Sequence, residues 1–141
     1  MNPIEYLEQT RDALQALCDE LTAELASAPA ATGKWNAEQH LEHLATAERG
    51  MLLGLRRQAG QTASEEELAA TAGKTDLILT RIARTVRAVE APAIVQPVGR
   101  YGVWPGARQA FFEAREATLQ FARTSPAESL AATVMPHPIL G

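Results

Sequence analysis

The sequence predicts an all-α protein with a single domain over residues 1–141. Apolar residues recur every three or four positions in several segments, which is the period of one face of a helix. Hydrophobic residues make up 46% of the chain, yet it has only two Trp, two Tyr and three Phe, so alanine, leucine and valine must form most of the core. No segments show the alternating pattern of paired strands. The length suits one continuous core and is too short for two domains of ordinary size.

The first helix is expected to begin at Pro3, whose fixed φ suits the first helical position, and to run to about Ala26. A stretch that contains proline and glycine, residues 28–33, then ends it. The apolar residues of this helix share one side and should face the core: Ile4, Leu7, Leu14, Cys18, Leu21 and Leu25. Cys18 is the only cysteine, so we expect a buried structural thiol rather than a disulfide or a reactive group.

A second helix is expected from Asn36 to about Gln58. Asn36 is a good N-cap, and Gln39 stands three residues later, where a capping box requires it. Trp35 precedes the cap and is expected to staple the start of this helix onto the bundle, which is a structural role.

The second helix has three faces at 100° per residue. The main apolar face is expected to contain Leu41, Leu44, Glu48, Met51, Leu52 and Leu55. The face toward water should carry Glu42, Arg49 and Arg56. The third face has two histidines beside small residues: His40, His43, Ala47, Gly50 and Gly54. Such a face permits either the close approach of a neighbouring segment or an open groove, and the sequence leaves both readings open.

Shorter helical segments follow. Ser64 and the three glutamates after it favour a new helix start, and Gly73 is expected to interrupt that helix. A short amphipathic helix is predicted over residues 75–89, ended by the Ala-Pro pair at 91–92.

Residues 93–107 are rich in glycine and proline and predict an ordered crossing loop around Tyr101 and Trp104. The last long helix is expected from about Arg108 to residues 125–126, followed by a brief helical turn at residues 127–131. Residues 135–138, Met-Pro-His-Pro, cannot continue a helix.

Charge and targeting signals exclude several classes of partner. The net charge of −4 and the lack of clustered lysine and arginine argue against nucleic-acid binding. Three arginines share a helix face with Glu42: Arg49, Arg56 and Arg57. This mixture of charges indicates a face exposed to solvent. The N-terminus mixes charged and apolar residues, so it resembles neither a signal peptide nor a membrane span. We therefore expect a cytoplasmic protein without a membrane partner.

The segment from Trp35 to Leu44, WNAEQHLEHL, resembles the signature of the DinB/YfiT-like superfamily, in which a Trp precedes the second helix and a His-Leu pair follows eight residues on. Glu48 stands where that family often carries an acidic residue. Residues 111–115 resemble the third bundle helix of the family, and residues 137–141 resemble the loop that introduces its last helix. The resemblance implies a four-helix bundle of the up-down-down-up type, with a long crossover between the second and third helices.

The resemblance also implies a divalent metal, zinc or nickel, held by three histidines, and it assigns one of these ligands to His43. The other two belong to a His-x-x-x-His pair on the final helix, where i and i+4 side chains project toward one ion. Residues 1–141 contain no such pair, so we expect a bundle without its last helix and with doubtful metal occupancy, because one imidazole cannot hold these metals.

Two alternatives for the histidines stay open. His40 and His43 are spaced i, i+3 and could share an ion, with His137 folding back as a third ligand. In the other alternative, His43 lines a groove without metal and bonds to a backbone group or a carboxylate such as Glu48.

Three functions stay open. The resemblance implies a metal-dependent enzyme, ancestrally a thiol-dependent S-transferase or hydrolase, which in this shortened form is active only if the full gene product has the His-x-x-x-His helix. Its base and pocket would come from the small-residue face and the loop from Tyr101 to Trp104. The second function is a non-catalytic bundle that binds a small ligand or dimerises through the surface left uncovered. The third is a truncated product of a longer DinB-like enzyme. A homodimer and a small-molecule thiol or substrate are the expected partners.

Overall fold

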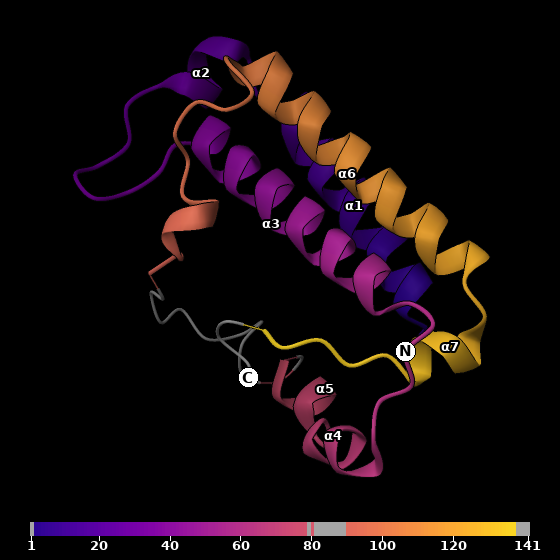
Figure 1. Ribbon diagram of the computed structural model, residues 1–141. Helices are drawn as coiled ribbons and strands as arrows, with labels where there is room; N and C mark the ends of the chain where they lie inside the picture. The colour runs from indigo at the N-terminus through magenta and orange to yellow at the C-terminus, as the bar shows by residue number, and fades with distance from the viewer. Residues whose placement is uncertain (1, 79, 81–89, 138–141) are drawn as a thin grey trace.

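A computed structural model describes residues 2–78, 80 and 90–137 of the chain (Figure 1). The regular elements are α1 (Pro3–Asp19), α2 (Ala23–Ser27), α3 (Ala37–Gln58), α4 (Glu65–Ala70), α5 (Lys74–Leu77), the 3₁₀ helix η2 (Ala93–Val95), α6 (Trp104–Thr124) and α7 (Ala127–Ala131). The described residues contain no strand, so the all-α prediction is confirmed. No helix in these ranges has the length and apolarity needed to cross a bilayer.

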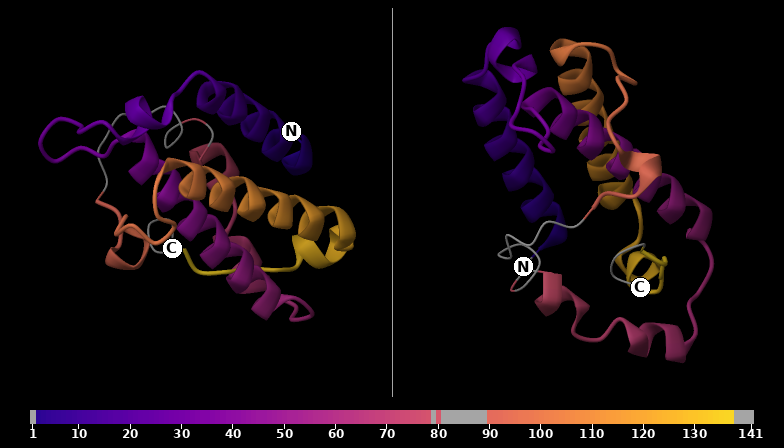
Figure 2. Two further views of the ribbon diagram at one scale, coloured as in Figure 1. Left: turned by 90° about the horizontal axis from the view of Figure 1, so that it is seen from above. Right: turned by 90° about the vertical axis from the view of Figure 1, so that its left-hand side faces the viewer.

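The long helices α1, α3 and α6 form the body of the fold. Helix α6 packs against both α3 and α1, and the view from above shows it between them (Figure 2). Helices α3 and α6 run in one direction and α1 runs in the other (Figure 1). The ion pairs between α1 and α6 fit this arrangement, because Arg108 binds Asp19 at one end and Arg123 binds Glu8 at the other. The directions match the first three helices of the predicted up-down-down-up bundle.

The centre of the fold is packed with small side chains. The largest cluster of buried residues consists of Cys18, Ala26, Leu41, Ala45, Trp104, Ala107, Ala110 and Phe111. Alanine at four of these eight positions lets helix backbones approach closely. Cys18 is 2% exposed, and burial raises the pKa of its thiol. The predicted buried structural cysteine is therefore confirmed.

The first predicted helix was too long. Helix α1 ends at Asp19, and Thr22 begins the separate helix α2 by accepting a hydrogen bond from the Leu25 amide at 3.2 Å. The break turns Leu25 outward, where it is 62% exposed, and buries Ala26 instead. Leu25 therefore does not belong to the core stripe.

The start of α3 is confirmed as predicted. The Asn36 side chain accepts a hydrogen bond from the Gln39 amide at 2.9 Å, and the Gln39 side chain accepts one from the Asn36 amide at 3.0 Å. This capping box satisfies two amides that a helix start would otherwise leave without partners.

The buried face of α3 differs from the predicted one. Its buried residues are Leu41, Glu42, Ala45, Glu48 and Leu52. Leu44 and Met51 were placed on the main apolar face but are partly exposed. Glu42 was placed on the face toward water and is buried, because a loop from later in the chain covers it.

Two short helices follow α3 and lie beyond the ends of the long helices (Figure 1). Ser64 and Glu67 form a capping box at the start of α4, as the acidic start predicted. Gly73 adopts a left-handed φ of 75° between α4 and α5, which confirms the predicted interruption. Of the helix predicted over residues 75–89, positions 79 and 81–89 lie outside the described residues.

Helix α6 begins at Trp104, four residues before the predicted start at Arg108. Pro105 occupies its first turn, a position that proline favours. Gly106 follows because a Cβ there would collide with the backbone oxygen of Tyr101. The end of α6 at Thr124, the turn of α7 and the irregular segment 133–137 agree with the predictions.

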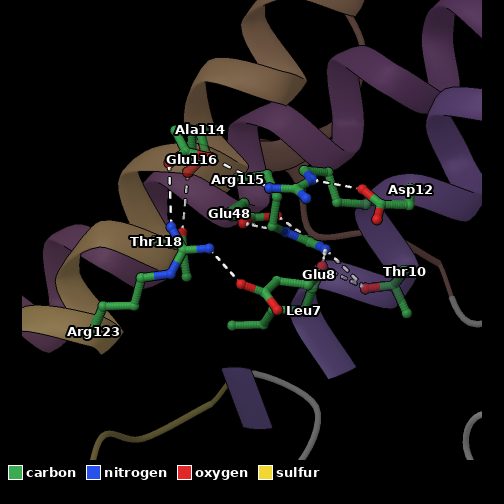
Figure 3. Close-up of polar contacts among 11 residues, drawn as sticks. Leu7, Glu8, Thr10, Asp12, Glu48, Ala114, Arg115, Glu116, Thr118 and Arg123 are labelled. Atoms are coloured by element: carbon green, nitrogen blue, oxygen red, sulfur yellow. Dashed lines mark hydrogen bonds and ion pairs between the residues drawn. The ribbon is translucent and has the colours of Figure 1, made fainter. Parts of the chain in front are cut away.

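A buried ion pair links the three long helices (Figure 3). Arg115 of α6 donates to the two carboxylate oxygens of Glu48 on α3, at 2.7 and 3.0 Å. Its Nη1 also donates to the backbone oxygen of Leu7 at 3.1 Å and to Thr10 Oγ1 at 2.9 Å, both on α1. Such a two-pronged contact fixes the relative placement of the helices, because guanidinium and carboxylate must be coplanar to form it.

Candidate functional site

A cavity of about 400 Å³ lies beside α3. Three segments line it: Trp35 with part of α3, the residues around η2, and the segment that follows α7. The lining residues are Trp35, His43, Ala47, Gly50, Met51, Ala91, Pro92, Ile94, Val95, Met135, Pro136 and His137.

The sequence left open whether the small-residue face of α3 borders a groove or a closely packed neighbour, and this face does both. A Cβ at Gly50 would meet no atom within 4 Å, so this part of the face borders open space. A Cβ at Gly54 would collide with the sulfur of Met135, so there a neighbouring segment approaches closely. The cavity exists because α3 carries Ala47 and Gly50 where larger side chains would fill it.

His43 lines this cavity and is half-buried. Its ring lies beside the Trp35 ring, with the centroids 5.1 Å apart and the planes at 45°. Its Nδ1 lies 2.9 Å from the backbone oxygen of Val95. A carbonyl oxygen only accepts, so Nδ1 must carry the hydrogen, and in the neutral ring Nε2 then carries the lone pair. That nitrogen can accept a hydrogen bond, take up a proton or bind a metal.

The structure separates the other two histidines. His137 lines the cavity together with His43. His40 is exposed and packs edge-on against Trp35, with centroids 5.5 Å apart. Desolvation, and then repulsion from nearby His43, lowers the pKa of His40. Residues 2–78, 80 and 90–137 contain no group of three or more His, Cys, Asp or Glu side chains that could hold a metal. The alternative trio of His40, His43 and His137 is therefore not assembled there.

Glu42, next to His43 on α3, is 4% exposed and binds the loop before α6. Its Oε1 accepts hydrogen bonds from the amides of Val98 at 2.8 Å and Arg100 at 3.0 Å, and its Oε2 accepts one from the Gly99 amide at 2.9 Å. The Arg100 guanidinium lies 3.3 Å from Oε1. Burial, the largest influence, raises the pKa of Glu42, but these donors together outweigh it and the pKa lies below its ordinary value.

Arg100 extends this contact to the cavity wall. Its guanidinium donates to the backbone oxygen of Gln96 at 2.6 Å and to that of Ile94 at 3.1 Å. The same segment carries Val95, whose oxygen binds His43. Glu42 and His43 are neighbours in the sequence, and both bond to the same loop: Glu42 to residues 98–100 and His43 to Val95. By fixing this loop, Glu42 indirectly sets the position of the His43 ring.

We expected the loop from Tyr101 to Trp104 to contribute to the cavity, but none of its residues is among the lining residues. Trp104 is buried in the core, and the Tyr101 hydroxyl lies 3.3 Å from Thr46 Oγ1. The Arg49 guanidinium covers the Tyr101 ring at 5.0 Å from its centroid. Glu48 is not the partner of His43, because it pairs with Arg115.

A family model described as the DinB superfamily matches residues 6–141. The chain belongs to the DinB superfamily. No curated protein and no solved structure matches it.

In this DinB-superfamily protein, His43 lines a cavity and its Nδ1 bonds to a backbone oxygen, and the metal-ligand role that the resemblance implied stays a prediction. Metal-binding histidines usually have such a second bond, which orients the ring. A zinc site requires at least three protein donors. Two histidines of the described residues, His43 and His137, line the cavity, but these residues contain no group of three possible ligands, so by themselves they do not fit the metal.

Proposed function

We propose that this DinB-superfamily protein binds a small, mainly apolar molecule in the cavity beside His43. The observation that carries the proposal is the bond from His43 Nδ1 to the Val95 oxygen at 2.9 Å, between two residues that line a mainly apolar cavity. Ligand sites in proteins typically combine a cavity of roughly 300–1,000 Å³ with a few polar groups of fixed orientation. A volume of about 400 Å³ with one oriented imidazole meets this description.

A fragment screen tests the proposal, with binding followed by protein-detected NMR. We expect the binding fragments to shift the indole signal of Trp35 and to lose affinity in Gly50→Leu, whose side chain would occupy the cavity. Arg57→Leu is the matched control, because Arg57 is an exposed residue of the same helix. Fragments that shift only residues away from the cavity would contradict the proposal.

The second candidate is the metal-dependent S-transferase or hydrolase that the resemblance implied, possessing zinc or nickel and using a small-molecule thiol. The orientation of the His43 ring favours it, because it is the orientation of a metal-bound histidine. The two further donors would come from outside the described residues. For a gene product that contains these donors, elemental analysis after equilibrium dialysis against zinc or nickel should show near-stoichiometric metal that His43→Gln loses and His40→Gln keeps. The coding DNA downstream of codon 141 shows whether a His-x-x-x-His pair follows.

The expected homodimer is also a proposal. It is supported by the partly exposed Leu44 and Met51 on α3 and by Leu17, 60% exposed, on α1. Sedimentation equilibrium tests it. The cytoplasmic location expected from the N-terminal sequence stays a prediction, which cell fractionation checks.

A further inference from the structure

We infer that the ligand of this cavity is an uncharged aromatic molecule with one hydrogen-bond donor, such as a hydroxyl group, and that this group donates a hydrogen bond to Nε2 of His43. The inference rests on the proposed function and names the chemical class that the cavity selects. Charge, surface character and hydrogen-bond direction each point to this class.

Charge excludes ionic ligands. Among the described residues that line the cavity, the ionisable ones are His43 and His137, and none is Asp, Glu, Lys or Arg. A charged ligand that enters an apolar cavity loses its hydration and must be compensated by an opposite charge. The nearest carboxylate along α3, that of Glu42, is already bound by three amides and a guanidinium. The binding of a phosphate, carboxylate or ammonium group in this cavity would therefore be unfavourable in free energy.

The surface of the lining favours an aromatic ligand. The lining residues include Trp35 and two methionines, Met51 of α3 and Met135 of the segment that follows α7. Thioether sulfurs make favourable contacts with aromatic rings, and their flexible side chains adapt to flat shapes. Pro92 and Pro136 add rigid apolar surface that loses no side-chain freedom on binding.

Hydrogen-bond direction requires a donor on the ligand. His43 Nδ1 already donates to Val95, so the neutral ring offers a lone pair at Nε2 and accepts from its ligand. The loop that carries Val95 is held by Glu42 and Arg100, so the Val95 oxygen stays in place and keeps the hydrogen on Nδ1. A ligand without a hydrogen-bond donor leaves this acceptor without a partner, and we expect it to bind about tenfold more weakly.

Three probes of nearly equal size test the inference on the unaltered protein at pH 7: 2-naphthol, 2-methoxynaphthalene and 2-naphthalenesulfonate. Isothermal titration calorimetry should give about tenfold tighter binding of 2-naphthol than of the ether, and weaker binding of the sulfonate than of either. His43→Phe should remove the preference for 2-naphthol and keep the affinity for the ether. His40→Phe, the matched control outside the cavity lining, should keep the preference.

The outcomes separate the two proposals. Equal affinity for 2-naphthol and its ether, or tightest binding of the sulfonate, would overturn the chemical class and leave the cavity as a ligand site. If none of the three probes binds, both the class and the proposed function are wrong. The comparison of probes on the unaltered protein does not depend on whether a variant folds. In addition, ¹⁵N shifts of His43 should report a hydrogen on Nδ1, and a hydrogen on Nε2 would overturn the inference.

Discussion

Replacing Glu42 with glutamine removes the charge that holds the loop before α6 and leaves the shape of the side chain almost unchanged. The carboxylate accepts three backbone N–H groups and lies 3.3 Å from the Arg100 guanidinium. An amide has one acceptor oxygen, so its NH₂ group must face at least one N–H donor. Placed at Oε2, that NH₂ group meets the Gly99 amide.

The cost follows from these contacts. A buried donor without a partner costs about 1–3 kcal/mol, and each hydrogen bond that loses its charged acceptor weakens by about 1 kcal/mol. Glu42→Gln is therefore expected to destabilise the protein by about 3 kcal/mol, close to the lower end of the values for breaking a buried ion pair. For a chain of this size, that corresponds to a fall in Tm of roughly 10 °C.

Thermal unfolding followed by circular dichroism measures this fall. Glu113→Gln is the matched control, because Glu113 is 57% exposed and lies 3.5 Å from Arg49, so its replacement should change the stability by less than about 0.5 kcal/mol. Hydrogen exchange should also show lost protection at the amides of Val98, Gly99 and Arg100. Equal Tm values for the two variants would refute the role assigned to Glu42.

The effect should depend on pH in a defined direction. The pKa of Glu42 is lowered in the folded state, so its ionised form is stabilised by folding. The contribution is fully present above the ordinary glutamate pKa of about 4.3 and is lost as the pH falls through the lower folded value. The stability gap between the unaltered protein and Glu42→Gln should therefore be widest near pH 7 and narrow below about pH 4. A gap that stays constant down to pH 2 would contradict the assignment.

Three further substitutions and one chemical reaction give expected outcomes. Gly50→Ala should raise the free energy of unfolding by about 1 kcal/mol because its Cβ meets open space, whereas Gly54→Ala should stabilise less because the Met135 side chain must move aside; urea unfolding measures both, and an equal or larger gain at Gly54 would contradict the described environment of the face. Glu48→Ala should cost about 3–5 kcal/mol in the same assay, because it leaves a buried arginine without its counter-charge; a loss below about 1 kcal/mol would argue against the ion pair. Cys18 should react with DTNB only after unfolding, because it is buried and its thiol pKa is raised; rapid reaction of the native protein would show an exposed thiol.

The long helices could be predicted where local signals mark them. Asn36 and Gln39 announce the start of α3, and Ser125 with Pro126 marks the end of α6. The break after Asp19 was missed because the apolar period continues through it, although Thr22 is a good N-cap. The start of α6 was missed because its first turn contains Pro105 among other loop-forming residues.

The site could be predicted in part. The resemblance to the superfamily singled out His43, and the small residues of α3 indicated either a groove or a close contact. Glu42 could not be found by periodicity, because a carboxylate is buried only when partners are supplied, and its partners lie 56 to 58 residues later in the chain. The partner of His43 was missed for the same reason, since Val95 lies 52 residues away.

The late position of α6 in the sequence affects how the protein folds during synthesis on the ribosome. Helix α6 is the element against which both α1 and α3 pack, and Glu8 lies 115 residues before its partner Arg123. At 5–20 residues per second, the N-terminal helix waits roughly 6–23 s for the segment that covers its apolar side. The nascent chain therefore exposes amphipathic surface during most of its elongation, and the core closes as a late, cooperative event rather than helix by helix.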